Sequence, residues 1–146
     1  MADILSFVDF FDILSKKTSE INSELEDIIT VETVEAPPLI EIKDMDERYN
    51  YYSVAVNIGL KVGQLISNAY FTRDACTRAK HKLQRDVSSP PKLIAQYIRD
   101  TDSLIQELDG IIQSATSYKS GIDNLIRFYQ NVCYMFGGII DVKSSI

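Results

Sequence analysis

The sequence contains few of the residues that build catalytic and metal-binding sites. Its 146 residues include one histidine, two cysteines and no tryptophan. Two cysteines without Cys-X-X-Cys spacing provide neither a zinc site nor a disulfide framework. The chain also lacks a glycine-rich phosphate loop and any apolar run long enough to cross a membrane. We therefore expect no enzyme activity, no metal or other cofactor, no small-molecule substrate and no membrane insertion.

The apolar N-terminus lacks the positive charge of a secretory signal. Its first fourteen residues contain Asp3, Asp9 and Asp12 but no lysine or arginine, whereas a signal peptide begins with a basic region. Cysteine usage gives no sign of an oxidising compartment. These features predict an intracellular protein, in the host cytoplasm, or a component of a virion, with free thiols.

Two long apolar series after residue 44 step by three and four residues, which is the spacing of helices that pack along a seam. They predict helices over about 44–86 and 90–136, joined by a Ser/Pro turn in which Ser89 serves as the N-cap of the second. A short turn makes the two helices antiparallel neighbours. The first series is Tyr51, Ala55, Ile58, Val62, Leu65, Ala69, Thr72, Cys76, Ala79 and Leu83. The second is Leu93, Tyr97, Thr101, Leu104, Leu108, Ile111, Ala115, Tyr118, Ile122, Leu125, Tyr129, Val132 and Phe136.

The remaining segments complete an all-α, single-domain protein built around this long helical hairpin (44–146). Residues 1–28 predict an N-terminal helical segment packed on the hairpin, with a break possible at 17–19. Residues 29–43 predict an extended segment, because β-branched residues alternate there and Pro37-Pro38 excludes helix. This segment is either a linker or an arm that pairs with another molecule. Glycines predict a kink near 116–120 and a helix stop at Gly137-Gly138.

Charge is unevenly distributed along a chain whose net charge is −6. Residues 1–49 carry 13 acidic and 4 basic residues, whereas residues 50–86 carry 6 basic and 2 acidic residues. The heptad positions place Arg78, Lys82 and Arg85 on one flank of the second helix, and Arg73 and Lys80 on the other.

Like charges stacked at helical spacing are mildly unfavourable alone, which favours an anionic partner for this basic segment. That partner is either nucleic-acid phosphate or the acidic N-terminal third of the chain itself. Tyr70 and Phe71 adjoin the segment and could stack on unpaired bases.

Three short motifs occur late in the chain or along the second helix. They are Tyr52-Ser53 followed by Asn57, the step Arg78-Ala79-Lys80, and Leu125-Ile126-Arg127-Phe128 leading to Gly137-Gly138. Over roughly residues 50–140 this arrangement resembles the UvsY-type recombination mediators of T4-like phages. The resemblance implies a phage protein whose chains form a ring, bind single-stranded DNA and assist recombinase loading. Arg78 and Lys80 match the family's basic DNA-contact step, but its C-terminal basic step beside glycine is absent.

Three functions follow as hypotheses, all for a non-enzymatic protein that forms homo-oligomers. The first is a recombination mediator that binds single-stranded DNA through Arg73, Arg78, Lys80, Lys82 and Arg85, with a recombinase as partner. The second is a structural or assembly protein, such as a small virion component, that bundles helices and uses the 29–43 arm to bind other structural proteins. The third is an acidic inhibitor whose N-terminal carboxylates imitate phosphates.

Overall fold

The computed structural model describes the backbone of residues 2–31 and 45–145, and the side chains of residues 7–30 and 50–131. It contains three helices, α1 (Ala2–Val31), α2 (Met45–Arg85) and α3 (Pro91–Ser145), and no strand within these ranges. The predicted all-α fold is confirmed. Residues 29–31 belong to α1 and not to the predicted extended segment, whose remaining residues lie outside the described ranges.

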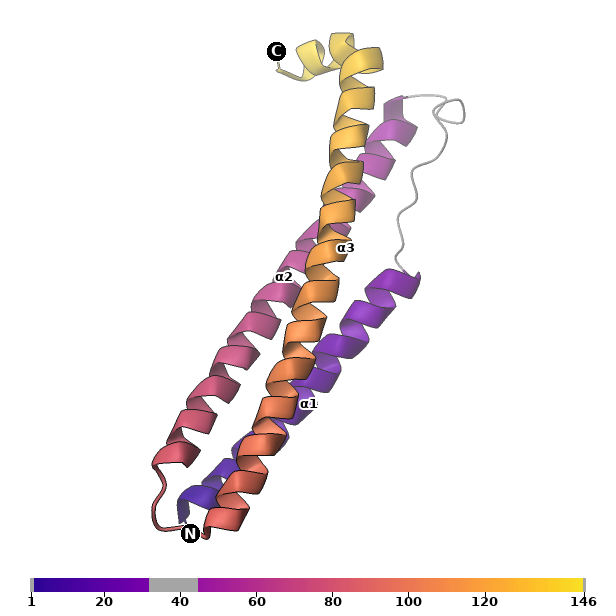
Figure 1. The fold of residues 1–146 in the computed structure, drawn as a ribbon. Coiled ribbons are helices and arrows are strands. Elements are labelled where there is room, and N and C mark those ends of the chain that lie inside the picture. The colour runs from indigo at the N-terminus through magenta and orange to yellow at the C-terminus, as the bar shows by residue number, and fades with distance from the viewer. Residues whose placement is uncertain (1, 32–44, 146) are drawn as a thin grey trace.

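The two long helices form the predicted antiparallel hairpin, and α1 lies along it. Figure 1 shows α2 and α3 side by side, with α1 beginning near the turn between them and running in the same direction as α3. Apolar residues of all three helices meet in one core cluster, which includes Leu14 and Ile21 of α1, Leu65 of α2 and Leu108 of α3. The hydrophobic effect therefore holds the bundle together along a continuous seam.

The predicted seam positions are the ones that the fold buries. Among those with described side chains, all are buried or half-buried except Leu93, which lies in the first turn of α3. Cys76 is fully buried, and this burial raises the pKa of its thiol to about 11. Gly59 lies in the α2–α3 contact, where a Cβ would make an ordinary van der Waals contact with Cγ2 of Ile122 at 3.4 Å.

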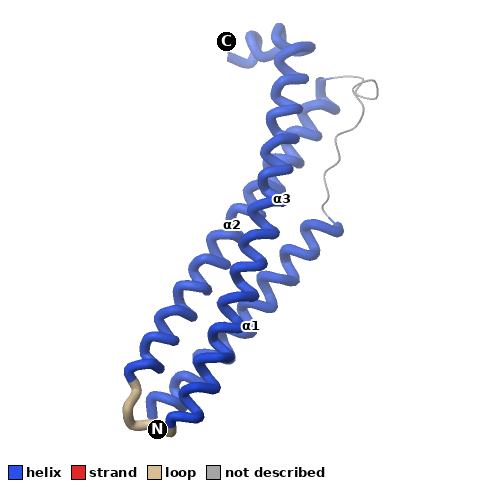
Figure 2. The backbone as a smooth tube through the Cα atoms, viewed as in Figure 1, coloured by secondary structure: helices blue, strands red, loops and turns tan. Residues whose placement is uncertain are grey.

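A tight turn joins α2 to α3, as the tube in Figure 2 shows. The Asp86 carboxylate organises it by accepting hydrogen bonds from the Ser88 backbone N–H at 2.9 Å and the Ser89 hydroxyl at 2.6 Å. These bonds, chiefly that from Ser89, lower the pKa of Asp86 to about 2. Ser89 therefore serves the turn and is not the predicted N-cap. Pro90 occupies the N-cap position instead, because its carbonyl accepts the first hydrogen bonds of α3, from the N–H groups of Leu93 and Ile94.

α1 and α3 are longer and more continuous than predicted, whereas α2 has nearly its predicted bounds. No break occurs at residues 17–19, because the Thr18 hydroxyl donates to the Leu14 carbonyl at 2.8 Å and α1 continues through it. α3 is continuous across residues 116–120, and the predicted stop at Gly137-Gly138 is wrong, since the helix continues to Ser145. No described glycine has the positive φ of a glycine C-cap. Packing along α3 outweighs a cost of about 1 kcal/mol per glycine.

α1 covers only part of the hairpin formed by α2 and α3. α1 has 30 residues against 41 in α2, and its Ile28 lies in the same groove as Lys61 and Leu65 of α2. Beyond that level α2 and α3 continue as a pair. An aromatic cluster closes this distal end: Tyr129 is buried and stacks on Tyr51, with ring centroids 5.8 Å apart.

Candidate nucleic-acid interface

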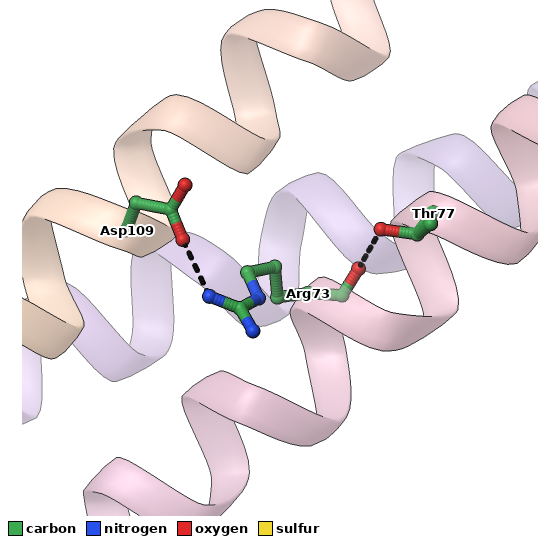
Figure 3. A network of polar contacts seen from close by, with 3 residues as sticks. All are labelled: Arg73, Thr77 and Asp109. Carbon is green, nitrogen blue, oxygen red and sulfur yellow. Dashed lines mark hydrogen bonds and ion pairs between the residues drawn. The ribbon is translucent and has the colours of Figure 1, made fainter.

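The five basic residues predicted as a site divide between two flanks of α2. Arg73 and Lys80 face α3, where each meets a carboxylate. The Nη1 atom of Arg73 lies 2.8 Å from Oδ1 of Asp109 (Figure 3), and Nζ of Lys80 lies 2.7 Å from Oδ1 of Asp102. Both ion pairs bridge the two helices of the hairpin. These two cations therefore already have anionic partners within the chain.

Arg73 is held by further contacts. Its guanidinium lies 4.9 Å from the centroid of the Tyr70 ring, which is a cation–π distance. Its backbone carbonyl accepts a hydrogen bond from the Thr77 hydroxyl at 3.1 Å, also drawn in Figure 3. The hydrogen bond to Asp109 is the main cause of a raised pKa for Arg73. A ligand would have to displace the Asp109 ion pair and the Tyr70 contact to engage this guanidinium.

The other flank of α2 carries Arg78, Lys82 and Arg85, all exposed. None of the three forms a hydrogen bond or an ion pair with another residue in the described parts of the chain. They lie at successive steps of four and three residues, so they follow one stripe of the helix. This cationic stripe is the part of the predicted site that is open to an external anion.

The cationic stripe borders a groove between the start of α1 and the end of α2. The groove has a volume of about 780 Å³. Its lining combines the three cations with Phe7, Phe10, Ile13, Ala75, Ala79, Leu83 and the acids Asp9 and Asp86. A charged wall beside an apolar one can hold a ligand that carries both anionic and flat apolar groups.

Exposed aromatic side chains continue this surface. Phe10 in the groove is 42% exposed. Phe71, which lies one heptad before Arg78 on the same face of α2, is 65% exposed. The Nζ atom of Lys17 lies 5.9 Å from the centroid of the Phe71 ring. Phe71 was predicted as a stacking residue, and its exposure leaves one face of the ring accessible to a base.

Among the residues with described side chains, no ion pair joins the five basic residues to the acidic N-terminal third, although Asp9 of α1 lines the groove beside the cationic stripe. The ion pairs of Arg73 and Lys80 lead to α3. Sequence reasoning missed Asp102 and Asp109, although a signal was present. Arg73 and Lys80 are one heptad apart on α2, and their partners are one heptad apart on α3. In an antiparallel pair of helices two such sets lie opposite each other.

Within the described residues no group of three or more His, Cys, Asp or Glu side chains could hold a metal ion. None of the helices, as far as they are described, combines the length and apolarity needed to cross a membrane. No protein-family model, curated protein or solved structure matches the chain. The resemblance to recombination mediators therefore stays a prediction.

Proposed function

We propose that this is a non-enzymatic binding protein that holds single-stranded DNA along the groove between α1 and α2. The observation that carries the proposal is the cationic stripe: Arg78, Lys82 and Arg85 are exposed, close together and unpaired within the described residues. Seven residues of helix rise by about 10.5 Å. Three like charges within that length favour binding of a regularly spaced anion such as a phosphate backbone.

The groove beside the stripe supports a single strand over a duplex. Unpaired bases expose flat apolar faces, and Phe10 and Phe71 offer exposed rings on which such faces could stack. A duplex keeps its bases stacked inside and would leave these rings unused. The net charge of −6 opposes nonspecific binding elsewhere on the molecule. We therefore assign the contact to this one groove.

Delivery of the bound DNA to a recombinase is the finer part of the same proposal, and the motif resemblance supports it. That resemblance points to Arg78 and Lys80. The geometry favours Arg78, because the amine of Lys80 is engaged by Asp102. Arg78, Lys82 and Arg85 are thus the expected principal contacts, and Arg73 and Lys80 the minor ones.

The test is a titration of labelled oligothymidine, followed by fluorescence anisotropy at low and at moderate salt. The variant Arg78→Ala/Lys82→Ala/Arg85→Ala should lose about tenfold or more in affinity at low salt. Three phosphate contacts should give the wild type a slope of about −2 in log affinity against log salt, because each contact contributes about −0.7 on a single strand. This slope should become nearly flat in the variant.

The matched control removes three exposed cations elsewhere, Lys16→Ala/Lys92→Ala/Arg127→Ala, and should retain most of the affinity. A second variant, Arg73→Ala/Lys80→Ala, should lose less than the stripe variant. Absence of binding by the wild type at low salt would reject the proposal. An equal loss in the matched control would show that net charge, and not the groove, governs binding.

A further inference from the structure

We infer that the face formed by α1 and α2 also joins two copies of this chain in an antiparallel, two-fold contact. The face has opposite charges at its two ends. The cationic stripe lies at the end near the α2–α3 turn. Glu20, Glu24 and Asp27 lie toward the other end, all exposed, and Glu24 and Asp27 line the α1–α2 groove there beside Lys61. None of these three carboxylates forms an ion pair with another described residue.

The two charged sets have the same spacing. Glu20, Glu24 and Asp27 are separated by four and three residues, as are Arg78, Lys82 and Arg85. Within one molecule α1 and α2 run in opposite directions (Figure 1). A two-fold axis perpendicular to the bundle reverses the second copy, so α1 of one copy runs parallel to α2 of the other. The acidic set of each copy then lies at the level of its partner's cationic stripe, diagonally across the contact and in matching order.

The contacts between α1 and α2 fix the level of this axis. Phe7 packs in one cluster with Leu83, Lys17 lies against Phe71, and Ile28 lies in the same groove as Leu65. This register places the axis level near Lys16 on α1. The level halfway between Glu24 and Lys82 is also halfway between Ile13 and Phe71, because the residues of each pair are 58 positions apart along the sequence.

Exposed apolar side chains occupy the centre of the proposed contact. Ile13 is 61% exposed and Phe71 is 65% exposed. The two-fold operation places Ile13 of each copy at the level of Phe71 of the other, diagonally across the centre of the contact. An apolar centre with charged groups toward its edges is the usual anatomy of a protein interface, and a self-complementary patch related by a two-fold axis closes as a dimer.

The size of the face sets the expected strength. It extends for about 20 residues of helix, roughly 30 Å, and two helices are about 20 Å wide. Two such faces bury on the order of 1,200 Å² in total, which is the lower limit for a specific and stable interface. We therefore expect a dimer of moderate affinity that weakens with salt because charge pairing contributes to it.

This inference does not rest on the proposed function. Both use the cationic stripe, so the dimer contact and a bound strand exclude each other. If the protein binds single-stranded DNA there, oligothymidine should convert dimers to monomers. If it does not bind DNA, the dimer contact is unaffected, and the two ideas fail separately.

The test measures the mass of the full chain by sedimentation equilibrium over a range of concentrations. The wild type should approach twice its 16.5 kDa monomer mass. Two charge-reversed variants, Arg78→Glu/Lys82→Glu/Arg85→Glu and Glu20→Lys/Glu24→Lys/Asp27→Lys, should each be monomeric alone. Mixed in equal amounts they should restore the dimer mass, because one variant is acidic at both ends of the face and the other basic. The matched control Lys16→Glu/Lys92→Glu/Arg127→Glu should dimerise like the wild type.

Circular dichroism on each variant establishes that it remains helical, and Ile13→Ala/Phe71→Ala provides a second disruption without charge reversal. The double apolar variant should weaken the dimer by about tenfold. A wild type that stays monomeric at all concentrations would overturn the inference. So would a dimer that persists in both charge-reversed variants, or folded variants whose mixture stays monomeric.

Discussion

The part of the hairpin that α1 covers and the distal part beyond it have cores made of different kinds of side chain. Where α1 covers the hairpin, three helices bury aliphatic residues such as Leu14, Leu65 and Leu108 in one cluster. At the distal end only α2 and α3 are present among the described residues, and Tyr51 and Phe128 pack around the buried Tyr129. Aromatic rings thus make up much of the cluster at the distal end, whereas aliphatic side chains make up the three-helix cluster. The kind of side chain along the seam therefore changes together with the number of helices that pack on it.

The largest loss of stability is expected from Leu108→Ala, in the part of the molecule where three helices pack together. Leu108 is fully buried, so its truncation leaves a cavity among helices that cannot easily close it. We expect a loss of about 2–5 kcal/mol in the free energy of unfolding, measured by urea denaturation. Leu60→Ala, at an exposed position, should change stability by less than about 0.5 kcal/mol. Similar values for the two variants would contradict the assignment of the core.

A smaller and more local effect is expected from Tyr51→Ala at the distal end. The change removes the stack on Tyr129 and part of its cover, at a cost of about 1–2 kcal/mol. Because α1 does not reach this level, the loss should appear as faster amide hydrogen exchange in residues 50–60 and 122–131, with little change in residues 100–112. Val54→Ala, half exposed on the same turn of α2, serves as the control. Uniform acceleration along the hairpin would show that the two ends form a single cooperative unit.

The ion pair between Arg73 and Asp109 shows how much charge contributes to the stability of the end that α1 covers. The side chains are 34% and 52% exposed, so solvent screens their attraction. A double-mutant cycle with Arg73→Ala and Asp109→Ala should give a coupling of only about 0.2–1 kcal/mol. A coupling well above that range would assign much of the stability of this end to electrostatics.

The subtlest test concerns Asp86 in the turn that closes the covered end. Its pKa is lowered from 3.8 to about 2 in the folded protein, chiefly by the hydrogen bond from Ser89. A lowered folded-state pKa means that Asp86 stabilises the fold above about pH 4, and that this contribution is lost as the pH falls toward 2. Thermal unfolding of Asp86→Asn should therefore differ from the wild type most above pH 4, and the two melting temperatures should converge toward pH 2. A constant difference across this range would exclude the carboxylate as the cause.

The hairpin could be predicted because the apolar spacing that defines each helix face involves residues close together in the sequence. The steps of three and four residues that include Ala55, Val62, Leu108 and Tyr129 specify one helix face, and those residues are buried. The helix ends were less predictable. Gly137-Gly138 suggested a stop, yet a glycine ends a helix only if the backbone turns into the left-handed region, and the surrounding packing can prevent that.

The candidate site was only partly predictable for a related reason. The heptad pattern separated Arg73 and Lys80 from Arg78, Lys82 and Arg85 without knowledge of the fold. It could not show which set would meet carboxylates, since that depends on the register between α2 and α3. The exposure of Phe71 was equally undetermined, because an aromatic residue at the edge of a stripe can lie under a neighbouring helix or outside it.

The sequence by itself thus determined the helices, their seam and the two flanks of α2, because helical periodicity assigns each residue to a face of its own helix. Only the tertiary structure decided that α3 lies against the flank of Arg73 and Lys80 and α1 against the flank of Arg78, Lys82 and Arg85. Two helices can pack on either side of a third with similar burial of apolar area, so the choice between the two arrangements depends on contacts between residues far apart in the chain.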